Sequence, residues 1–320
     1  MTSTPMSFTV LLAAPRGFCA GVERAIRTVE LALESRAAGD ARPVYVRHEI
    51  VHNKVVVDDL RARGAVFVED TSEIPVGSMA IFSAHGIPPA IRDEAVARGL
   101  VTLDATCPLV ARVHAAVLRY AGRGYAILFV GHAGHPEVEG VMGEAPQQVR
   151  LIETLADVER VEVPDPDRVA YSTQTTLSLD DVSSIVEALR RRFPAMVGPE
   201  AGDVCYATQN RQEAVLALVQ AHRADVVLVL GSPNSSNSNR LREVAESAGA
   251  RGYLLGTADE LDPGWLDGAR RVGVSAGAST PEHLVQSLIE RLRALGATDV
   301  QPVETSKEDV FFAPPPIRSS

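Results

Sequence analysis

The chain contains only three cysteines, and each lies in a short turn directly before a pattern typical of a helix. The three turns are Pro15-Arg16-Gly17-Phe18-Cys19-Ala20-Gly21, Asp104-Ala105-Thr106-Cys107-Pro108 and Asp203-Val204-Cys205-Tyr206. A lone cysteine is usually a small buried hydrophobe. Three cysteines at the same position of a recurring pattern instead favour a metal centre, because thiolates bind zinc and iron–sulfur clusters.

The spacing of the cysteines leaves two kinds of metal centre open. None of them lies in a Cys-x-x-Cys pair, so the usual spacing of a structural zinc site is absent. Cubane iron–sulfur clusters normally take four cysteine ligands. Three thiolates therefore leave one iron without a protein thiol, where a substrate oxygen could bind. Zinc held by three cysteines and a water is the alternative, and spacing alone does not exclude it.

Polar side chains follow the predicted strands at similar distances after each cysteine. His48, His135 and Ser235 form one such set, and His85, Thr175 and Ser279 form a second. In parallel sheets, ligand-binding groups gather beyond the carboxyl ends of the strands. We therefore expect the cysteines and these polar side chains to face one centre.

Two polar runs indicate an anionic substrate. Ser235-Ser236-Asn237-Ser238-Asn239 stands directly before a predicted helix, and Ser279-Thr280-Pro281 begins another. Helix N-termini favour phosphate and other anions because their first N–H groups are not used within the helix. Ordinary capping accounts for Ser279 and Thr280, but a run of five polar residues exceeds what capping needs. His48 and His85 would add donors to the same anion.

Glu137 is the candidate general acid. It follows a predicted strand in His135-Pro136-Glu137, and it is the carboxylate expected closest to the centre. A general acid at this position needs a proton relay, for which Thr175 in the adjacent turn is the expected neighbour. Glu49 and Glu139 are rivals by position, but solvated surface groups are the more ordinary interpretation of both.

The elements that must position these residues alternate between short strands and helices. This alternation predicts an α/β fold with parallel sheets covered on both faces. We expect three pseudo-equivalent α/β units around the metal centre, with the N-terminal strand completing the third. Their predicted boundaries are 20–106, 107–204, and 205–300 together with 8–19, and residues 301–320 are expected to form a loose C-terminal tail.

Composition limits the possible partners. The chain has 320 residues and a net charge of −10, which argues against general nucleic-acid binding. No apolar run reaches the roughly 18 residues that a membrane span needs. The N-terminal residues lack the basic and apolar regions of a signal peptide. We therefore expect a cytoplasmic protein without membrane or nucleic-acid partners.

Long motifs along residues 8–300 resemble the LytB family, the 4-hydroxy-3-methylbut-2-enyl diphosphate reductases. The matching stretches are Pro15-Arg16-Gly17-Phe18-Cys19-Ala20-Gly21-Val22, Val46-Arg47-His48-Glu49-Ile50-Val51-His52-Asn53, Phe82-Ser83-Ala84-His85-Gly86, Asp104-Ala105-Thr106-Cys107-Pro108-Leu109-Val110, Gly131-His132-Ala133-Gly134-His135-Pro136-Glu137-Val138-Glu139-Gly140, Thr173-Gln174-Thr175-Thr176-Leu177-Ser178, Cys205-Tyr206-Ala207-Thr208-Gln209-Asn210-Arg211-Gln212, Asn234-Ser235-Ser236-Asn237-Ser238-Asn239-Arg240 and Ala276-Gly277-Ala278-Ser279. Their number and order make the resemblance specific.

The resemblance implies a reductive dehydroxylation that yields isopentenyl and dimethylallyl diphosphate. It implies that Cys19, Cys107 and Cys205 hold one [4Fe–4S] cluster whose open iron binds the substrate hydroxyl, and that Glu137 protonates the departing oxygen. Thr175 matches the residue beside that hydroxyl. The remaining matches bind substrate, most of them at its diphosphate: His48, His85, His135, Ser235, Ser236, Asn237 and Ser279. Because the chain has no nucleotide or flavin fingerprint, the electrons are expected to come from an external donor, and the resemblance implies ferredoxin or flavodoxin.

Two other classes of function remain open at this point. A [4Fe–4S] hydro-lyase would use the open iron as a Lewis acid and would need no reductant. A zinc or iron sensor without catalytic activity would bind a partner instead of a substrate.

Overall fold

The computed structural model describes residues 7–37, 39, 42–199 and 203–317, which fall into two compact units. One unit contains the residues up to Cys19, His52–Val56 and Tyr206–Val310. The other contains Ala20–Val51, Val57–Cys205 and the residues from Phe311 on. The strands form three sheets whose neighbouring strands all run parallel, so the predicted α/β class with parallel sheets is confirmed. The domain boundaries drawn from the cysteines stay a prediction.

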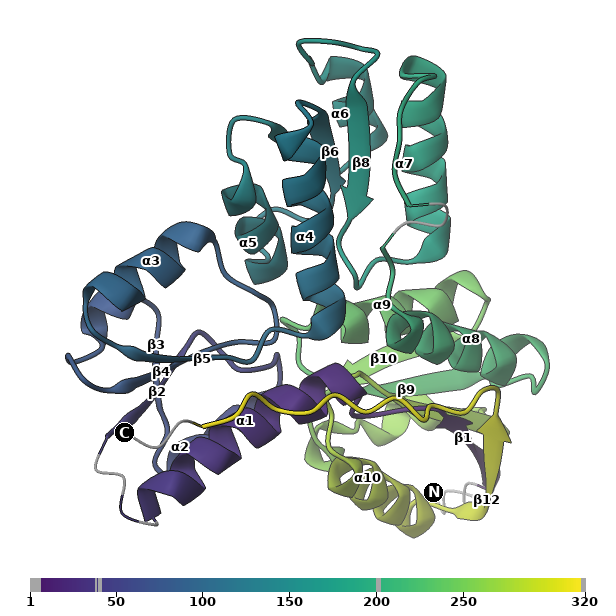
Figure 1. Ribbon diagram of the computed structural model, residues 1–320. Helices are drawn as coiled ribbons and strands as arrows, with labels where there is room; N and C mark the ends of the chain where they lie inside the picture. The colour runs from purple at the N-terminus through teal and green to yellow at the C-terminus, as the bar shows by residue number, and fades with distance from the viewer. Residues whose placement is uncertain (1–6, 38, 40–41, 200–202, 318–320) are drawn as a thin grey trace. The chain divides into compact units, whose positions relative to one another are not determined.

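The first unit is built on the sheet β10-β9-β11-β1-β12. Its strands are β1 (Phe8–Ala14), β9 (Val226–Leu230), β10 (Arg251–Leu255), β11 (Arg271–Ala276) and β12 (Ala297–Glu304), and its helices are α8 (Tyr206–Gln220), α9 (Ser236–Ser247), α10 (Glu282–Ala294) and the 3-10 turns η2 (Ala258–Glu260) and η3 (Pro263–Leu266). In Figure 1, α10 lies on one side of this sheet and α8 and α9 lie on the other.

Strand β1 shows why this sheet needs cover on both faces. Val10 and Leu12 pack with Leu228 and the apolar face of α10, whereas Leu11 and Ala13 pack with residues of α8 and α9. A strand buried on both faces is apolar at successive positions and not at alternating ones. The continuous apolar run from Val10 to Ala13 is therefore typical of a central strand.

Strand β12 was not predicted, and its second half, residues 301–304, falls in the tail that we expected to be loose. It pairs in parallel with β1 from Phe8↔Ala297 to Ala14↔Glu304 and forms the edge of the sheet. Most of its side chains are exposed, and Val303 is the buried one. An edge strand can be largely polar because only part of its surface is covered. It therefore lacks the apolar run by which the other strands were recognised.

The second unit contains two sheets, β3-β2-β4-β5 and β7-β6-β8. Its strands are β2 (Val44–Arg47), β3 (Val66–Val68), β4 (Met79–Phe82), β5 (Val101–Asp104), β6 (Ala126–Val130), β7 (Val149–Ile152) and β8 (Val169–Thr173). Its helices are α1 (Ala20–Ala37), α3 (Pro89–Ala97), α4 (Pro108–Gly122), α5 (Pro136–Glu144), α6 (Leu155–Arg160), α7 (Leu179–Arg192) and the 3-10 turn η1 (Thr71–Glu73), while α2 (Lys54–Ala62) begins in the first unit and ends in the second.

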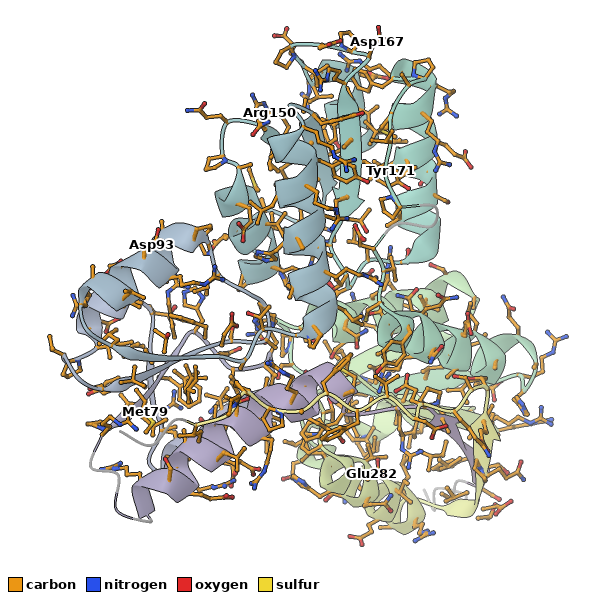
Figure 2. All side chains as sticks on the ribbon, in the orientation of Figure 1. Met79, Asp93, Arg150, Asp167, Tyr171 and Glu282 are labelled. Carbon is orange, nitrogen blue, oxygen red and sulfur yellow. The ribbon has the colours of Figure 1, made fainter. Side chains whose placement is uncertain are left out.

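Helices cover the sheet β7-β6-β8 from both sides. Val113 of α4 and Val138 of α5 pack with Phe129 on one face, and residues of α6 and α7 pack with Leu128 on the other. Figure 1 shows β6 and β8 between α4 and α7. Tyr171, labelled in Figure 2, belongs to the core beneath α7.

Two short helices of this unit were not predicted, and one of them matters for the site. Helix α5 begins at Pro136, among the residues that follow the predicted strand, and α6 follows β7. Gly140 and Gly143 lower the helix propensity of α5, and its length of 9 residues offers few apolar repeats. Packing of Val138 and Val141 stabilises it despite this weak local signal.

No helix among the residues that the structure describes is long and apolar enough to cross a membrane.

Leu228→Ala should destabilise the first unit. Leu228 is fully buried at the centre of β9, so truncation removes its packing on both neighbouring strands and α10. We expect a loss of about 2–5 kcal/mol in the free energy of unfolding, measured with urea. Leu118→Ala, at an exposed position of α4, is the control and should change it by less than about 1 kcal/mol. Equal effects of the two substitutions would contradict this assignment of the core.

Candidate active site

The residues expected to do chemistry fall into a cluster in each unit. The first unit contains Cys19, Ser235, Ser236, Asn237 and Ser279, and the second contains His48, His85, Cys107, His135, Glu137, Thr175 and Cys205. In both clusters the residues stand in loops after strands or in the first turns of helices.

Each of the three cysteines makes the same kind of backbone hydrogen bond. The N–H of Cys19 donates to the carbonyl of Ala278 at 3.2 Å, that of Cys107 to Ala84 at 3.0 Å, and that of Cys205 to Thr175 at 3.1 Å. Each acceptor lies in a loop that directly follows a strand, namely β11, β4 and β8. The repetition inferred from the sequence is therefore present at the level of individual hydrogen bonds.

Each cysteine also stands at the beginning of a helix. Cys107 is the N-cap of α4, and Cys19 and Cys205 directly precede the first residues of α1 and α8. All three are half-buried. The positive end of a helix dipole favours a negatively charged group, so these positions suit thiolate ligands. Among the described residues, no three His, Cys, Asp or Glu side chains lie close enough together to hold a single metal ion.

Glu137 is buried in the second unit and bonded to Thr175. Its exposed fraction is 1%, and it lies in the first turn of α5. Oε1 accepts the backbone N–H of Thr175 at 2.8 Å, and Oε2 accepts the Thr175 hydroxyl at 3.0 Å. Because the N–H of Cys205 donates to the carbonyl of the same threonine, Thr175 connects the carboxyl group directly to a cysteine loop.

Burial raises the pKa of Glu137 to about 7. The two hydrogen bonds from Thr175 favour the charged form and lower the pKa, but they are outweighed by the loss of solvent. The negative charge of Asp203 raises it further. A carboxylic acid with a pKa near neutrality can hold its proton until the moment of transfer, which is what a general acid needs.

Two histidines are connected to Glu137 in series, His135 through the Glu137 backbone and His85 through the ring of His135. His135 caps α5, and its Nδ1 accepts the backbone N–H of Glu137 at 3.1 Å. Since Nδ1 accepts, the neutral ring carries its proton on Nε2, which makes Nε2 a donor. The rings of His85 and His135 meet edge to face with centroids 5.6 Å apart, and Ser83 Oγ lies 3.2 Å from His85 Nδ1.

His48 has an unusual backbone conformation. Its φ of 59° is in the left-handed region that non-glycine residues seldom adopt. Its backbone N–H donates to Val68 at 2.8 Å, and Nε2 lies 3.6 Å from a carboxylate oxygen of Glu69. Burial, followed by the positive charge of Arg47, lowers the pKa of His48. The ring is therefore neutral at pH 7 and can donate one hydrogen bond without a fixed charge.

In the first unit, Asn237 links the start of α9 to the Cys19 loop. Its Oδ1 accepts the backbone N–H of Ala278 at 2.9 Å, and the carbonyl of Ala278 accepts the N–H of Cys19. Asn237 is 5% exposed, and its Nδ2 has no hydrogen-bond partner among the described residues. A buried amide donor without a partner is costly, so this atom is suited to a ligand oxygen.

Serines complete this cluster. Ser235 is the N-cap of α9, where its Oγ accepts the N–H of Ser238, and Ser279 Oγ donates to the carbonyl of His52 at 2.9 Å. The polar run was expected before the helix, but α9 begins at Ser236, so most of the run forms the first helical turn. The positive end of the α9 dipole lies at this turn and favours an anion, as at other helix N-termini.

The sequence did not single out four residues with buried ionisable side chains near these loops. Asp203 accepts from Ser172 Oγ and the Thr173 N–H, and its backbone N–H donates to Thr173 Oγ1. The others are Arg211 in the first unit and the pair His114–Glu144 in the second, joined at 2.7 Å. The candidate residues were recognised because they follow predicted strands at similar distances after each cysteine. That criterion does not identify Arg211, His114 or Glu144, because they lie within or at the ends of helices.

Comparison with known proteins decides the family. The profile described as "LytB protein" matches residues 10–293. The chain is also 57% identical over 306 residues to the 4-hydroxy-3-methylbut-2-enyl diphosphate reductase of Aromatoleum aromaticum, covering 96% of each chain. This chain belongs to the LytB family. A Burkholderia mallei protein named 4-hydroxy-3-methylbut-2-enyl diphosphate reductase 2 is 55% identical, with 96% of this chain and 92% of the relative covered.

Solved structures of LytB-type reductases are similar as well. The E-1-hydroxy-2-methyl-but-2-enyl-4-diphosphate reductase from Plasmodium falciparum superimposes with a TM-score of 0.90 at 37% identity, covering 95% of this chain and 94% of that one. A structure of (E)-4-hydroxy-3-methyl-but-2-enyl diphosphate reductase, the terminal enzyme of the non-mevalonate pathway, gives a TM-score of 0.63 at 32% identity over 90% and 99% of the two chains.

Glu137→Gln should stabilise the protein at alkaline pH only. Since the folded-state pKa of Glu137 is raised from 4.5 to about 7, the stability contributed by its neutral form is complete below about 4.5 and is lost as the pH rises through about 7. Glutamine cannot ionise, so the variant should gain on the order of 3 kcal/mol over the natural protein between about pH 4 and pH 9. Urea unfolding at both pH values measures this gain.

The exposed residue Glu139 offers the matched control for this experiment. Glu139→Gln removes a carboxyl group from the same helix without removing a buried one, and it should show no comparable pH dependence. A stability difference for Glu137→Gln that is the same at both pH values would show that Glu137 does not titrate as expected.

Proposed function

We propose that this chain reduces (E)-4-hydroxy-3-methylbut-2-enyl diphosphate to isopentenyl and dimethylallyl diphosphate, the last step of the methylerythritol phosphate route to isoprenoids. Its membership of the LytB family supports the assignment to the oxidoreductases. The observation that carries the proposal is the buried carboxyl group of Glu137. It has a pKa of about 7 and is connected through Thr175 to the loop of Cys205.

The proposed cofactor is one [4Fe–4S] cluster held by Cys19, Cys107 and Cys205. The donor set fits, because three half-buried thiols stand at helix N-termini, where thiolate is favoured. Their loops are held by equivalent backbone hydrogen bonds, which prepares the ligands before the cofactor arrives. When bound, such a cluster would supply electrons to the substrate and one iron without a protein thiolate.

Glu137 acts as the proton donor in this proposal. Removal of the allylic hydroxyl group consumes two electrons and two protons, and one proton must reach the oxygen so that it departs as water. At neutral pH a substantial fraction of Glu137 carries that proton. Thr175 holds both carboxyl oxygens, so the orientation of the acid is fixed before substrate binds. The second proton is delivered to the allylic carbon skeleton.

The diphosphate group is assigned to neutral donors. Ser235, Ser236, Asn237 and Ser279 would bind it from the first unit, and His48 and His85 from the second. Asn237 Nδ2, which has no partner among the described residues, and the start of α9 support this assignment. His135 is assigned to substrate binding, with Nε2 as its donor because Nδ1 accepts the N–H of Glu137.

The electrons come from an external carrier, ferredoxin or flavodoxin. The cluster ligands must remain reduced thiols, which favours a cytoplasmic location because thiols persist there. The net charge of −10 makes nucleic acid an unsuitable partner.

Anaerobically purified protein should contain about four irons and four sulfides per chain and reduce the hydroxylated diphosphate when given a strong one-electron donor. Turnover without reductant would instead indicate a hydro-lyase, and one zinc without sulfide would indicate a zinc protein.

Glu137→Gln should lower turnover about 10²- to 10⁴-fold while iron and sulfide remain bound. Glu139→Gln should retain turnover, and full turnover of Glu137→Gln would refute the assigned proton donor.

The Asn237 side chain should contribute mainly to substrate affinity. Asn237→Ala removes the donor assigned to the diphosphate and leaves the N–H of Ala278 without its acceptor. We expect the KM for the substrate to rise about tenfold or more, with a smaller change in kcat, because a hydrogen bond to a charged group contributes about 1.5–3 kcal/mol. Asn239→Ala, in the same turn but bonded to Pro233 and Ser235, is the control. Equal KM values for both variants would contradict the role of Asn237.

A further inference from the structure

Arg211 holds the loop that carries Cys19. It lies in α8, is 0% exposed and is the largest fully buried side chain of the described residues. Its Nε and Nη2 donate to the carbonyl of Gly17 at 3.0 and 2.8 Å, and Nη2 also donates to the carbonyl of Phe18 at 3.1 Å. These carbonyls belong to the two residues directly before Cys19. The guanidinium group therefore fixes the approach of the chain to that cysteine.

The counter-charge of Arg211 comes from the C-terminal segment, residues 305–317, which lies within the tail that we had expected to be loose. Glu308 Oε1 accepts from Arg211 Nη1 at 2.9 Å and from Asn210 Nδ2 at 3.0 Å, and Oε2 accepts from Nη1 and Nη2. The Glu308 side chain is 15% exposed. A buried guanidinium without a partner is strongly unfavourable, so Arg211 depends on Glu308 to remain where it is.

The Cys19 loop is held equally closely on its other side. The N–H of Gly17 donates to the carbonyl of Ala276 at 3.1 Å, and the N–H of Cys19 donates to Ala278. Gly17 has a φ of +64°, and a Cβ at this position would lie 2.9 Å from the carbonyl oxygen of Thr280. Because the loop fits closely against the residues after β11, a loss of the Arg211 contacts releases it from one side only.

The same C-terminal segment has a second anchor in the other unit. Arg24 of α1 donates through Nε to the carbonyl of Ala313 at 3.0 Å and through Nη1 to the carbonyl of Thr106 at 2.8 Å. Its Nη2 donates to the backbone carbonyl of Asp104 at 3.3 Å. Thr106 directly precedes Cys107. Near Ala313 the segment lies beside α1 (Figure 1). At both places, the C-terminal segment accepts hydrogen bonds from an arginine, and the same arginine donates to backbone carbonyls just before a cysteine.

We infer that the C-terminal segment is a positioning element for the cysteine ligands, acting through Arg211–Glu308 on the Cys19 loop and through Arg24–Ala313 on the Cys107 loop. This inference rests on the proposed iron–sulfur function. Glu308 touches no reacting group, and its role is to keep a ligand loop in the geometry that retains the cofactor. Groups that orient metal ligands typically change metal affinity 10- to 100-fold when removed.

Glu308→Gln in the full-length protein tests the inference. After anaerobic reconstitution, the visible absorbance of the cluster should decay about tenfold faster in air than in the natural protein, and iron and sulfide should fall together. The electron paramagnetic resonance spectrum of the reduced protein should change, since the thiolate of Cys19 is displaced. Glu308→Asp, which keeps the charge, should restore much of the lifetime. Arg24→Ala should shorten it independently, which keeps the inference testable if Glu308→Gln does not fold.

Two controls separate positioning from general stability. Glu304→Gln changes an exposed carboxylate in the same region and should leave cluster lifetime and spectrum unchanged. Leu228→Ala lowers the stability of the first unit without touching a cysteine loop and should also leave the spectrum unchanged.

The possible results distinguish this inference from the proposed function. Natural protein without iron and sulfide refutes the proposed function and the inference with it. Natural protein with a cluster, together with a normal lifetime and spectrum for both Glu308→Gln and Arg24→Ala, refutes the inference alone. Equal losses in Glu308→Gln and Leu228→Ala also refute it, because the segment would then act only through overall stability.

Discussion

A single backbone hydrogen bond recurs at the three cysteines, and the arrangement of the candidate ligands depends on it. Each cysteine N–H donates to a carbonyl in the loop after a strand: Ala278 after β11, Ala84 after β4 and Thr175 after β8. Cys19 and Cys107 follow strands that pair directly with β11 and β4. Before Cys205 the corresponding strand is reduced to one bridge between Ala170 and Val197. The geometry at the cysteine is retained even where the preceding strand is almost lost.

This constraint also determines which side chains can lie near a cysteine. The residue that supplies the carbonyl, or its neighbour, is in each case one predicted to contact substrate: His85 beside Ala84, Thr175 itself, and Ser279 beside Ala278. In the second unit, hydrogen bonds and one ring contact connect His85, His135, Glu137 and Thr175 in series. The raised pKa of Glu137 follows from its burial in this environment, which outweighs the opposing hydrogen bonds from Thr175.

Much of this organisation follows from local patterns in the sequence. Short β-branched runs identify the buried strands, and the polar residues after them are positioned by the direction of the chain. The proximity of Glu137 and Thr175 could be predicted in this way. Helix α5 and strand β12 could not, because α5 is held by packing and β12 is a largely exposed edge. The Arg211–Glu308 pair joins residues far apart in the sequence, and neither pattern nor spacing distinguishes them from ordinary surface charges.

The position of β1 has a consequence for biosynthesis. Both of its partners, β11 and β12, begin after residue 270, so they are synthesised long after β1 itself. At the usual rates of translation, its apolar residues remain without their native neighbours for roughly 15 to 60 seconds. The sheet of the first unit can therefore be completed only after β12 has been synthesised, and Cys19 gains its native surroundings later than Cys107. A cofactor that needs both cysteines can consequently be inserted only after this sheet has formed, and until then the apolar side chains of β1 lack their native cover.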